Sequence, residues 1–166
     1  MTTSPSEGRA PRPSLRALRD PVQLLALGFG SGLVPAAPGT AGSLIGLAAA
    51  ILVAQWGVWA AAATTAVVVV AVVWICGEGA RRLGVHDHPA IVWDEIAGMM
   101  IAMLAAPQGW GWAALAFALF RLFDIIKPWP IREIDHAMRG GAGIMLDDVM
   151  AGILAALGLL LARSIT

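Results

Sequence analysis

The chain has 166 residues, of which 58% are hydrophobic and 13% charged, and its formal net charge is zero. Soluble domains carry about 25% charged residues, whereas this chain has no charged residue between Asp20 and Glu78. This composition excludes a soluble globular domain and gives no sign of a basic, nucleic-acid-binding surface. It indicates an integral membrane protein.

The first 20 residues contain four arginines and several prolines and serines, but they lack the apolar core of a secretory signal peptide. We expect a mobile basic tail over 1–20 that lies on the membrane surface, followed by a single helical domain over 21–166. The arginines are Arg9, Arg12, Arg16 and Arg19.

Six apolar segments follow the tail. Each is predicted to be a helix, because an unpaired strand in lipid would leave its backbone groups without hydrogen-bond partners. The fold class is therefore all-α, an integral membrane bundle of about five to six short helices. The first segment contains glycine and proline and is predicted to be re-entrant or interfacial, whereas the third, about 19 residues long, is the clearest membrane span. The segments cover 21–34, 43–55, 58–76, 91–106, 111–126 and 148–162.

The arginine-rich start places the N-terminus in the cytoplasm by the positive-inside rule. If the first segment does not cross and the other five do, the turns at 55–59 and 106–112 lie outside. The connections at 77–90 and 127–147 then lie inside. Both outer turns are uncharged and rich in tryptophan, which favours membrane interfaces. The polar stretches gather on the cytoplasmic face, where we expect the functional site.

Four carboxylates interrupt otherwise apolar segments. Asp94 and Glu95 lie in IVWDEIAGMM, and Asp147 and Asp148 lie in GIMLDDVMAG, each pair near the start of a predicted helix. Ionisable groups at membrane depth are costly and usually mark function. The alternative is that they only complement the dipoles of two helix N-termini.

Small residues follow one acid of each pair at intervals of four, which lets two helix backbones approach closely. If these two seams face each other, the acids meet at the cytoplasmic end. Clustered carboxylates repel unless a cation lies between them, and oxygen ligands favour Mg²⁺. The two series are Asp94, Gly98, Ala102 and Asp148, Gly152, Ala156.

The motif FRLFDIIKPWPIR spaces Arg121, Asp124 and Lys127 three residues apart, on one flank of a helix that two prolines then end. Asp124 would join the metal ligands, while Arg121 and Lys127 would hold phosphate oxygens. Alternatively, the three side chains neutralise one another at the membrane interface.

The glycine-rich loop GFGSGLVPAAPGTAGS leads into a helix and could cradle an anion, with Thr40 and Ser43 near its end. It lacks the lysine of a P-loop, and such a stretch is equally typical of a helix break in membranes.

His86 and His88 precede the acidic helix, and either could protonate a leaving alkoxide because histidine titrates near neutral pH. A polar interfacial loop is the alternative. Cys76 and Arg82 match the C-x5-R spacing of cysteine phosphatases, but that chemistry needs an activated thiolate in a phosphate loop. Because Cys76 ends a hydrophobic helix, we interpret the spacing as coincidental.

Four of these motifs, GFGSGLVPAAPGTAGS, GVHDHPAIVWDEIAGM, FRLFDIIKPWPIR and GGAGIMLDDVMAG, resemble in this order the phosphatidylglycerophosphatase A family. The resemblance covers about 22–160. It implies a Mg²⁺-dependent enzyme that hydrolyses phosphatidylglycerophosphate to phosphatidylglycerol and phosphate in bacterial phospholipid biosynthesis. It also implies a compact helical bundle, multi-pass in the bacterial inner membrane, whose substrate lies in the cytoplasmic leaflet.

On this resemblance, the expected reaction is phosphoryl transfer to a water activated by one or two Mg²⁺ ions, with an aspartyl-phosphate route as the alternative. His86 or His88 would act as the general acid, and Arg121 and Lys127, with Thr40 and Ser43, would bind the phosphoryl group. The metal ligands would be Asp94, Glu95, Asp124, Asp147 and Asp148.

A cation transporter or channel is the second functional class, since intramembrane acids also mark ion paths. The clustering of acids at one end, with an uncharged outer half, disfavours it. The sequence gives no oligomeric state.

Overall fold

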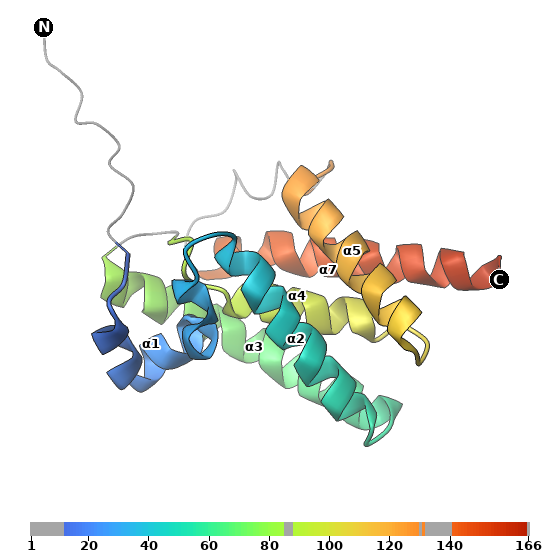
Figure 1. The fold of residues 1–166 in the computed structure, drawn as a ribbon, viewed down its shortest axis with the longest axis horizontal. Coiled ribbons are helices and arrows are strands. Elements are labelled where there is room, and N and C mark those ends of the chain that lie inside the picture. Colours follow the sequence, from blue (N-terminus) through green and yellow to red (C-terminus); the bar gives the residue numbers. More distant parts are fainter. Residues whose placement is uncertain (1–11, 85–87, 130, 132–140, 166) are drawn as a thin grey trace, which may run out of the picture.

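The computed structural model describes residues 12–84, 88–129, 131 and 141–165, and within these ranges the chain is helical without strands, as the sequence predicted. The elements in chain order, with 3-10 helices labelled η, are η1 (Leu15–Arg19), α1 (Pro21–Ala26), η2 (Gly28–Leu33), α2 (Pro38–Ala54), α3 (Val58–Leu83), α4 (Trp93–Met103), α5 (Trp110–Ile126) and α7 (Gly141–Ser164) (Figure 1).

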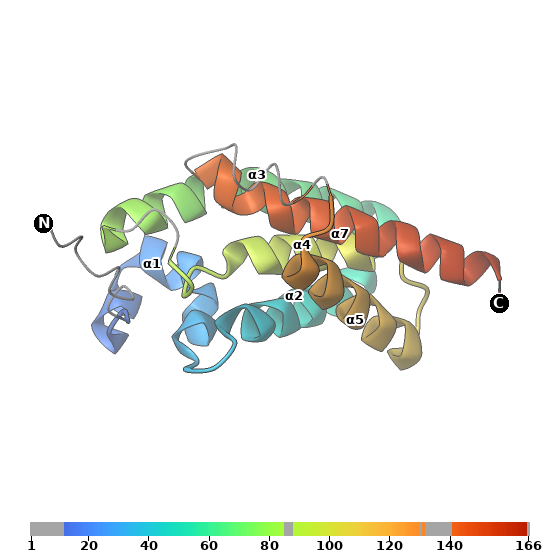
Figure 2. The same cartoon turned by 90° about the horizontal axis from the view of Figure 1, so that it is seen from above.

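Helix α4 is the centre of the bundle, because α2, α3, α5 and α7 all pack against it (Figures 1 and 2). Every residue from Ile96 to Met100 is buried. The sequence of α4 is accordingly apolar on all sides after its first turn, as expected for a helix that is enclosed by others. The acids of that first turn, Asp94 and Glu95, are therefore carried into the bundle.

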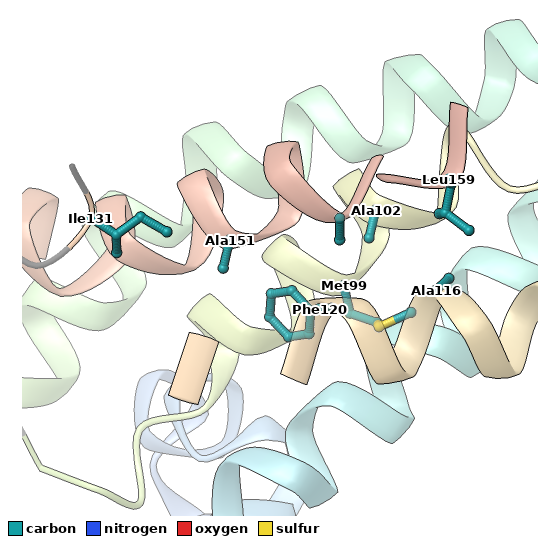
Figure 3. Packing of buried hydrophobic residues seen from close by; sticks show 8 residues of the cluster. Met99, Ala102, Ala116, Phe120, Ile131, Ala151 and Leu159 are labelled. Carbon is teal, nitrogen blue, oxygen red and sulfur yellow. The ribbon is translucent and has the colours of Figure 1, made fainter. Parts of the chain in front are cut away.

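The largest hydrophobic core lies where α4, α5 and α7 meet (Figure 3). Many of its members are alanines, so the three backbones approach closely. Ala102 shares this core with Ala155, which lies three residues after Gly152, whereas the sequence pattern had predicted Ala156. The buried members are Met99, Ala102, Ala116, Phe120, Ile131, Ala151, Ala155 and Leu159.

The predicted glycine seam between α4 and α7 is confirmed. A Cβ on Gly98 would lie 2.6 Å from the carbonyl oxygen of Asp148 and 2.7 Å from the ring of Phe120. A Cβ on Gly152 would overlap the carbonyl oxygen of Gly98. Only glycine permits this approach, and the approach brings the acidic part of α7 against the start of α4.

Among the residues that the structure describes, two helices are long and apolar enough to cross a membrane, α3 and the Met145–Ser164 part of α7. On α3, Val67 and Val70 are 68% and 74% exposed, as expected for side chains that face lipid. Helix α4 has 11 residues and rises about 16 Å, roughly half of the ~30 Å hydrocarbon core. It is therefore too short to cross the hydrocarbon core as a single straight helix, although the whole segment 91–106 was predicted to cross.

Helix α3 also continues beyond the predicted end at Cys76, to Leu83. Its last turns are held by ion pairs along the helix surface: Glu78 accepts from Arg81 at 2.6 Å and from Arg82 at 2.7 Å. Such pairs three and four residues apart support a helix after its apolar run has ended.

Two other helices begin earlier than predicted. Helix α2 begins at Pro38, because proline suits the first position of a helix. Helix α7 begins at Gly141, so Asp147 and Asp148 lie well inside it. A helix dipole acts within the first turn, so it does not account for these two acids, although it applies to the pair that opens α4.

The N-terminal elements fold back onto α3. Asp20 caps α1 and accepts hydrogen bonds from Arg82 at 2.5 Å, and this guanidinium holds the pKa of Asp20 below its usual range. The buried amide of Gln23 donates to the carbonyl oxygen of Gly79 at 3.1 Å. The predicted tail is thus in contact with the bundle over 12–20, and residues 1–11 lie outside the described part.

Candidate active site

The first turn of α4 carries two acids, Asp94 and Glu95, whose carboxylates have different neighbours. The backbone N–H of Val92 donates to the carbonyl oxygen of Ala26 at 3.0 Å and fixes the chain just before the helix. Asp94 is 5% exposed, and its carboxylate accepts the backbone N–H of Glu95 at 3.1 Å. The Glu95 carboxylate reaches the start of α2, where a Cβ on Gly39 would overlap it.

Asp148 of α7 completes a group with these two acids. Asp94, Glu95 and Asp148 each place a carboxylate oxygen within 4.8 Å of the others, and we call them the carboxylate cluster. In the described part of the chain, Glu95 Oε2 and Asp148 Oδ1 are buried without a hydrogen-bond partner. Three adjacent carboxylates repel strongly, and an oxygen-only donor set suits a hard divalent cation. The cluster therefore fits such an ion.

Asp124 and Asp147 each pair with a cation beside the cluster. Arg121 contacts Asp124 at 2.5 Å within α5, and Lys127 contacts Asp147 of α7 at 2.5 Å. The Asp124 side chain also lies beside that of Asp148. The structure thus brings all five predicted metal ligands together, but it distributes them as a cluster of three and two acids with cationic partners.

Lys127 does not lie on the helix flank where the spacing of FRLFDIIK predicts it. Helix α5 ends at Ile126, and Lys127 takes a left-handed conformation with φ of 44°. This turn takes its side chain off the helix flank, toward α7. Arg121, Asp124 and Lys127 are therefore not a self-neutralising row, because the lysine pairs with a different helix.

The start of α2 contributes support for Arg121. The buried hydroxyl of Ser43 donates to the carbonyl oxygen of Gly39 at 2.8 Å and accepts from Arg121 at 3.3 Å. A hydroxyl has a single proton to donate, so in this arrangement Ser43 has none left for a phosphoryl oxygen. Its position makes it a residue that orients the Arg121 guanidinium.

Gly39 was not singled out as a site residue by the sequence, although it lies in the glycine-rich loop. Its missing side chain lets α2 approach both Glu95 and Arg121, since an added Cβ would also lie 3.3 Å from the guanidinium. The preceding Pro38 marks the helix start and was the signal that could have placed Gly39 there. Thr40 follows in the same first turn and is partly exposed.

His88 lies in a neighbouring pocket of about 120 Å³, whose lining includes Pro38 and Arg12 but none of the five acids. The ring is 4% exposed, and its Nδ1 accepts the backbone N–H of Ala90 at 3.1 Å. In the neutral ring the proton is then on Nε2. His86 lies outside the described residues.

Cys76 is buried beside the carboxylate cluster, with its sulfur facing the backbone N–H of Asp94. No motif or spacing predicted this proximity. Activation of a thiolate needs a positive and partly exposed environment, whereas Cys76 is fully buried and close to three carboxylates. The surroundings thus agree with the interpretation that its spacing to Arg82 is coincidental.

Comparison with known proteins identifies the family to which the chain is related. The profile of the family described as Phosphatidylglycerophosphatase A matches residues 24–163. A Haemophilus influenzae protein named Phosphatidylglycerophosphatase A is 48% identical over 141 residues, covering 84% of this chain and 86% of that protein. The Escherichia coli protein of the same name is 43% identical over 142 residues, covering 84% and 81%.

A Bacteroides thetaiotaomicron protein, named provisionally as a phosphatidylinositol-3-phosphatase, is 39% identical over 150 residues, covering 84% of this chain and 92% of that protein. No solved structure matches. The matched range contains the carboxylate cluster and both cationic neighbours, and the resemblance inferred from the four motifs is confirmed. The chain is a phosphatase that belongs to the phosphatidylglycerophosphatase A family.

Proposed function

We propose that the chain is a Mg²⁺-dependent phosphatase that hydrolyses phosphatidylglycerophosphate to phosphatidylglycerol and phosphate at the carboxylate cluster. Membership of the family supports the phosphatase activity and a phospholipid substrate. The observation that best supports the site is the set of buried, unpartnered carboxylate oxygens of Glu95 and Asp148, next to the guanidinium of Arg121.

Asp94, Glu95 and Asp148 would hold the Mg²⁺, which when bound neutralises phosphoryl oxygens and activates water as a nucleophile. Arg121 and Lys127 bind the phosphoryl oxygens of the substrate.

The pairing acids Asp124 and Asp147, with Ser43, hold the two cations in place before the substrate arrives. Preorganised charges of this kind stabilise the transition state without reorganising during the reaction. His88 is the described histidine that is a candidate for protonating the leaving glycerol oxygen, which it would do as an imidazolium, and Thr40 is a candidate donor to the phosphate.

Phosphate release from phosphatidylglycerophosphate is expected to stop in EDTA and to return when Mg²⁺ is added, because oxygen ligands and a phosphate substrate suit this ion. The assay measures inorganic phosphate from the purified protein in detergent. Phosphatidylinositol 3-phosphate is an informative second substrate, since one relative carries its name.

The matched variant is Cys76→Ser, which should keep most of the activity and the same response to EDTA. Full turnover in chelator would remove the metal from the proposal, and a loss of activity in Cys76→Ser would revive thiol chemistry.

We further propose that the chain lies in the bacterial inner membrane with the carboxylate cluster facing the cytoplasm. The α2–α3 turn, the α4–α5 turn and the C-terminus lie at one end of the bundle (Figure 1). Trp59 and Trp110 at that end are 85% and 81% exposed, as suits a membrane interface. The paired charges Glu78 and Arg82 lie at the other end, with the cluster, which favours a cytoplasmic position.

Thiol labelling in intact cells tests this orientation in a Cys76→Ser background. A cysteine replacing Gln108, in the α4–α5 turn, is expected to react with a membrane-impermeant maleimide. A cysteine replacing the exposed Arg81, at the end of α3, should react only after the cells are opened. The reverse pattern would contradict a substrate in the cytoplasmic leaflet.

A further inference from the structure

The chain that follows α5 forms a turn with an exposed tryptophan at its tip. On one side of the turn, Lys127 ends α5 and contacts Asp147 of α7. On the other side, the backbone N–H of Ile131 donates to the carbonyl oxygen of Pro128 at 2.8 Å, and the Ile131 side chain is fully buried in the α4–α5–α7 core (Figure 3). Trp129, between these two attachments, is 77% exposed. The turn therefore holds this side chain away from the bundle.

The last turn of α5 adds an apolar surface beside Trp129. Ile125 and Ile126 are 70% and 61% exposed, and they directly precede Lys127. This end of α5 projects beyond α7 (Figure 1). We call Ile125, Ile126 and Trp129 the α5 edge. Because Lys127 lies within it in the sequence, the edge places exposed apolar side chains next to a cation that is proposed to bind the phosphoryl group.

A lipid surface is the partner that suits the α5 edge. Tryptophan combines a large apolar ring with a polar N–H, and it favours the boundary between lipid headgroups and acyl chains. Helix α5 begins at Trp110, which is 81% exposed, and its 17 residues rise about 25 Å. That length is close to the ~30 Å hydrocarbon core. The exposed tryptophans at the two ends of α5 therefore have the spacing of the two membrane interfaces.

We propose that the α5 edge inserts into the cytoplasmic leaflet and that phospholipid reaches Lys127 and the carboxylate cluster from this side of the bundle. The inference rests on the proposed function and adds to it the route by which the substrate enters the site. Insertion brings the headgroups of the leaflet next to Lys127, so a phosphate monoester enters directly from the interface. Lipid contacts of the edge are the same in the bound substrate and in the transition state, so they lower KM and leave kcat unchanged.

Quenching by spin-labelled lipid tests the insertion without a measurement of activity. Trp129→Cys in a Cys76→Ser background is labelled with a fluorophore and reconstituted into phosphatidylcholine vesicles. A nitroxide at carbon 5 of the lipid acyl chain should quench this label at least about threefold more strongly than a label on Arg81→Cys, because an interfacial tryptophan lies near that depth. The Arg81 side chain is 72% exposed at the charged end of α3. Equally weak quenching at both positions would overturn the proposal.

The kinetics of Trp129→Ala test the route. In vesicles, KM for phosphatidylglycerophosphate is expected to rise about fivefold while kcat stays within about twofold of the wild type. Trp129→Phe keeps an apolar ring and should recover most of this difference. The matched control is Trp74→Ala, which removes a tryptophan that is 62% exposed on α3, outside the α5 edge. Its KM should stay at the wild-type value.

A short-chain substrate separates lipid entry from a distortion of the site. Dihexanoyl-phosphatidylglycerophosphate below its critical micelle concentration reaches the cluster from water, so Trp129→Ala should hydrolyse it with the kcat/KM of the wild type. An equal loss with both substrates would show that Trp129 acts by positioning Lys127. An equal rise of KM in Trp74→Ala would show a general effect of tryptophan loss. Either result contradicts the α5 edge as the route and leaves the proposed function standing.

The two proposals fail in different measurements. If the wild type released no phosphate from the long-chain lipid, the proposed function would fail and the route with it. The quenching experiment would then still decide whether the α5 edge lies in the lipid.

Discussion

Asp94→Asn, Glu95→Gln and Asp148→Asn are each expected to lower kcat for phosphatidylglycerophosphate at least ~100-fold, as seen when a preorganised charge is removed from an active site. Each replaces a carboxylate of the cluster by an amide of the same shape, so helical content and expression should stay close to the wild type. The measurement is the rate of phosphate release at saturating lipid and Mg²⁺. Glu78→Gln, on α3 outside the cluster, is the control acid and should remain active.

Stability separates a catalytic role from a packing role for these acids. Without metal, neutralising one member relieves repulsion and desolvation, so the metal-free variants should unfold at the same temperature as the wild type or higher. If Asp94 and Asp148 hold the same ion, the double variant should be little slower than either single variant, because residues that act as a unit are not additive. Near wild-type rates in all three amides would exclude the cluster as the site.

Gly98→Ala is expected to lower both stability and activity, because its Cβ would lie 2.6 Å from the carbonyl oxygen of Asp148. That atom belongs to the backbone and cannot rotate away, so α4 and α7 must separate. Overpacking of this kind costs about 1–3 kcal/mol, and here the separation also moves Asp148 away from Asp94. Thermal unfolding in detergent and the kcat of the surviving folded protein measure the two effects.

The control for this prediction is Gly111→Ala. Gly111 is also helical, but nothing lies within 4 Å of a Cβ at its position, so alanine should be neutral or slightly stabilising there. Equal stability and activity of the two variants would show that the seam tolerates separation and would contradict the close approach as a requirement for the site.

Much of the fold could be predicted because the patterns that indicate it extend over many residues. Apolar runs define the helices, and the glycines that follow Asp94 and Asp148 at intervals of four indicate which faces meet. When two helices pack along such a seam, the contact also sets the positions of their acids relative to each other. The carboxylate cluster was therefore accessible from the sequence alone.

The cationic partners were not accessible in the same way, because each depends on where a helix ends. The direction of Lys127 follows from the end of α5 at Ile126 and from a left-handed residue, which no helical periodicity predicts. Similarly, the hydrogen bond from Ser43 to the carbonyl oxygen of Gly39 needs α2 to begin at Pro38 rather than at 43. Single residues and tertiary contacts determine where a helix ends. A hydropathy pattern extends over many residues and therefore does not locate that end.

The shortness of α4 has a consequence for how the protein is made. A segment that covers about half of the bilayer has no stable position in lipid by itself, and α4 also carries Asp94 and Glu95, whose burial needs partners. The glycine seam that encloses it is completed by α7, which is synthesised after the other described helices. The acidic helix therefore stays unassembled until α7 has been synthesised, and a chain truncated before Gly141 would expose an unassembled acidic segment to the proteases that clear membrane proteins.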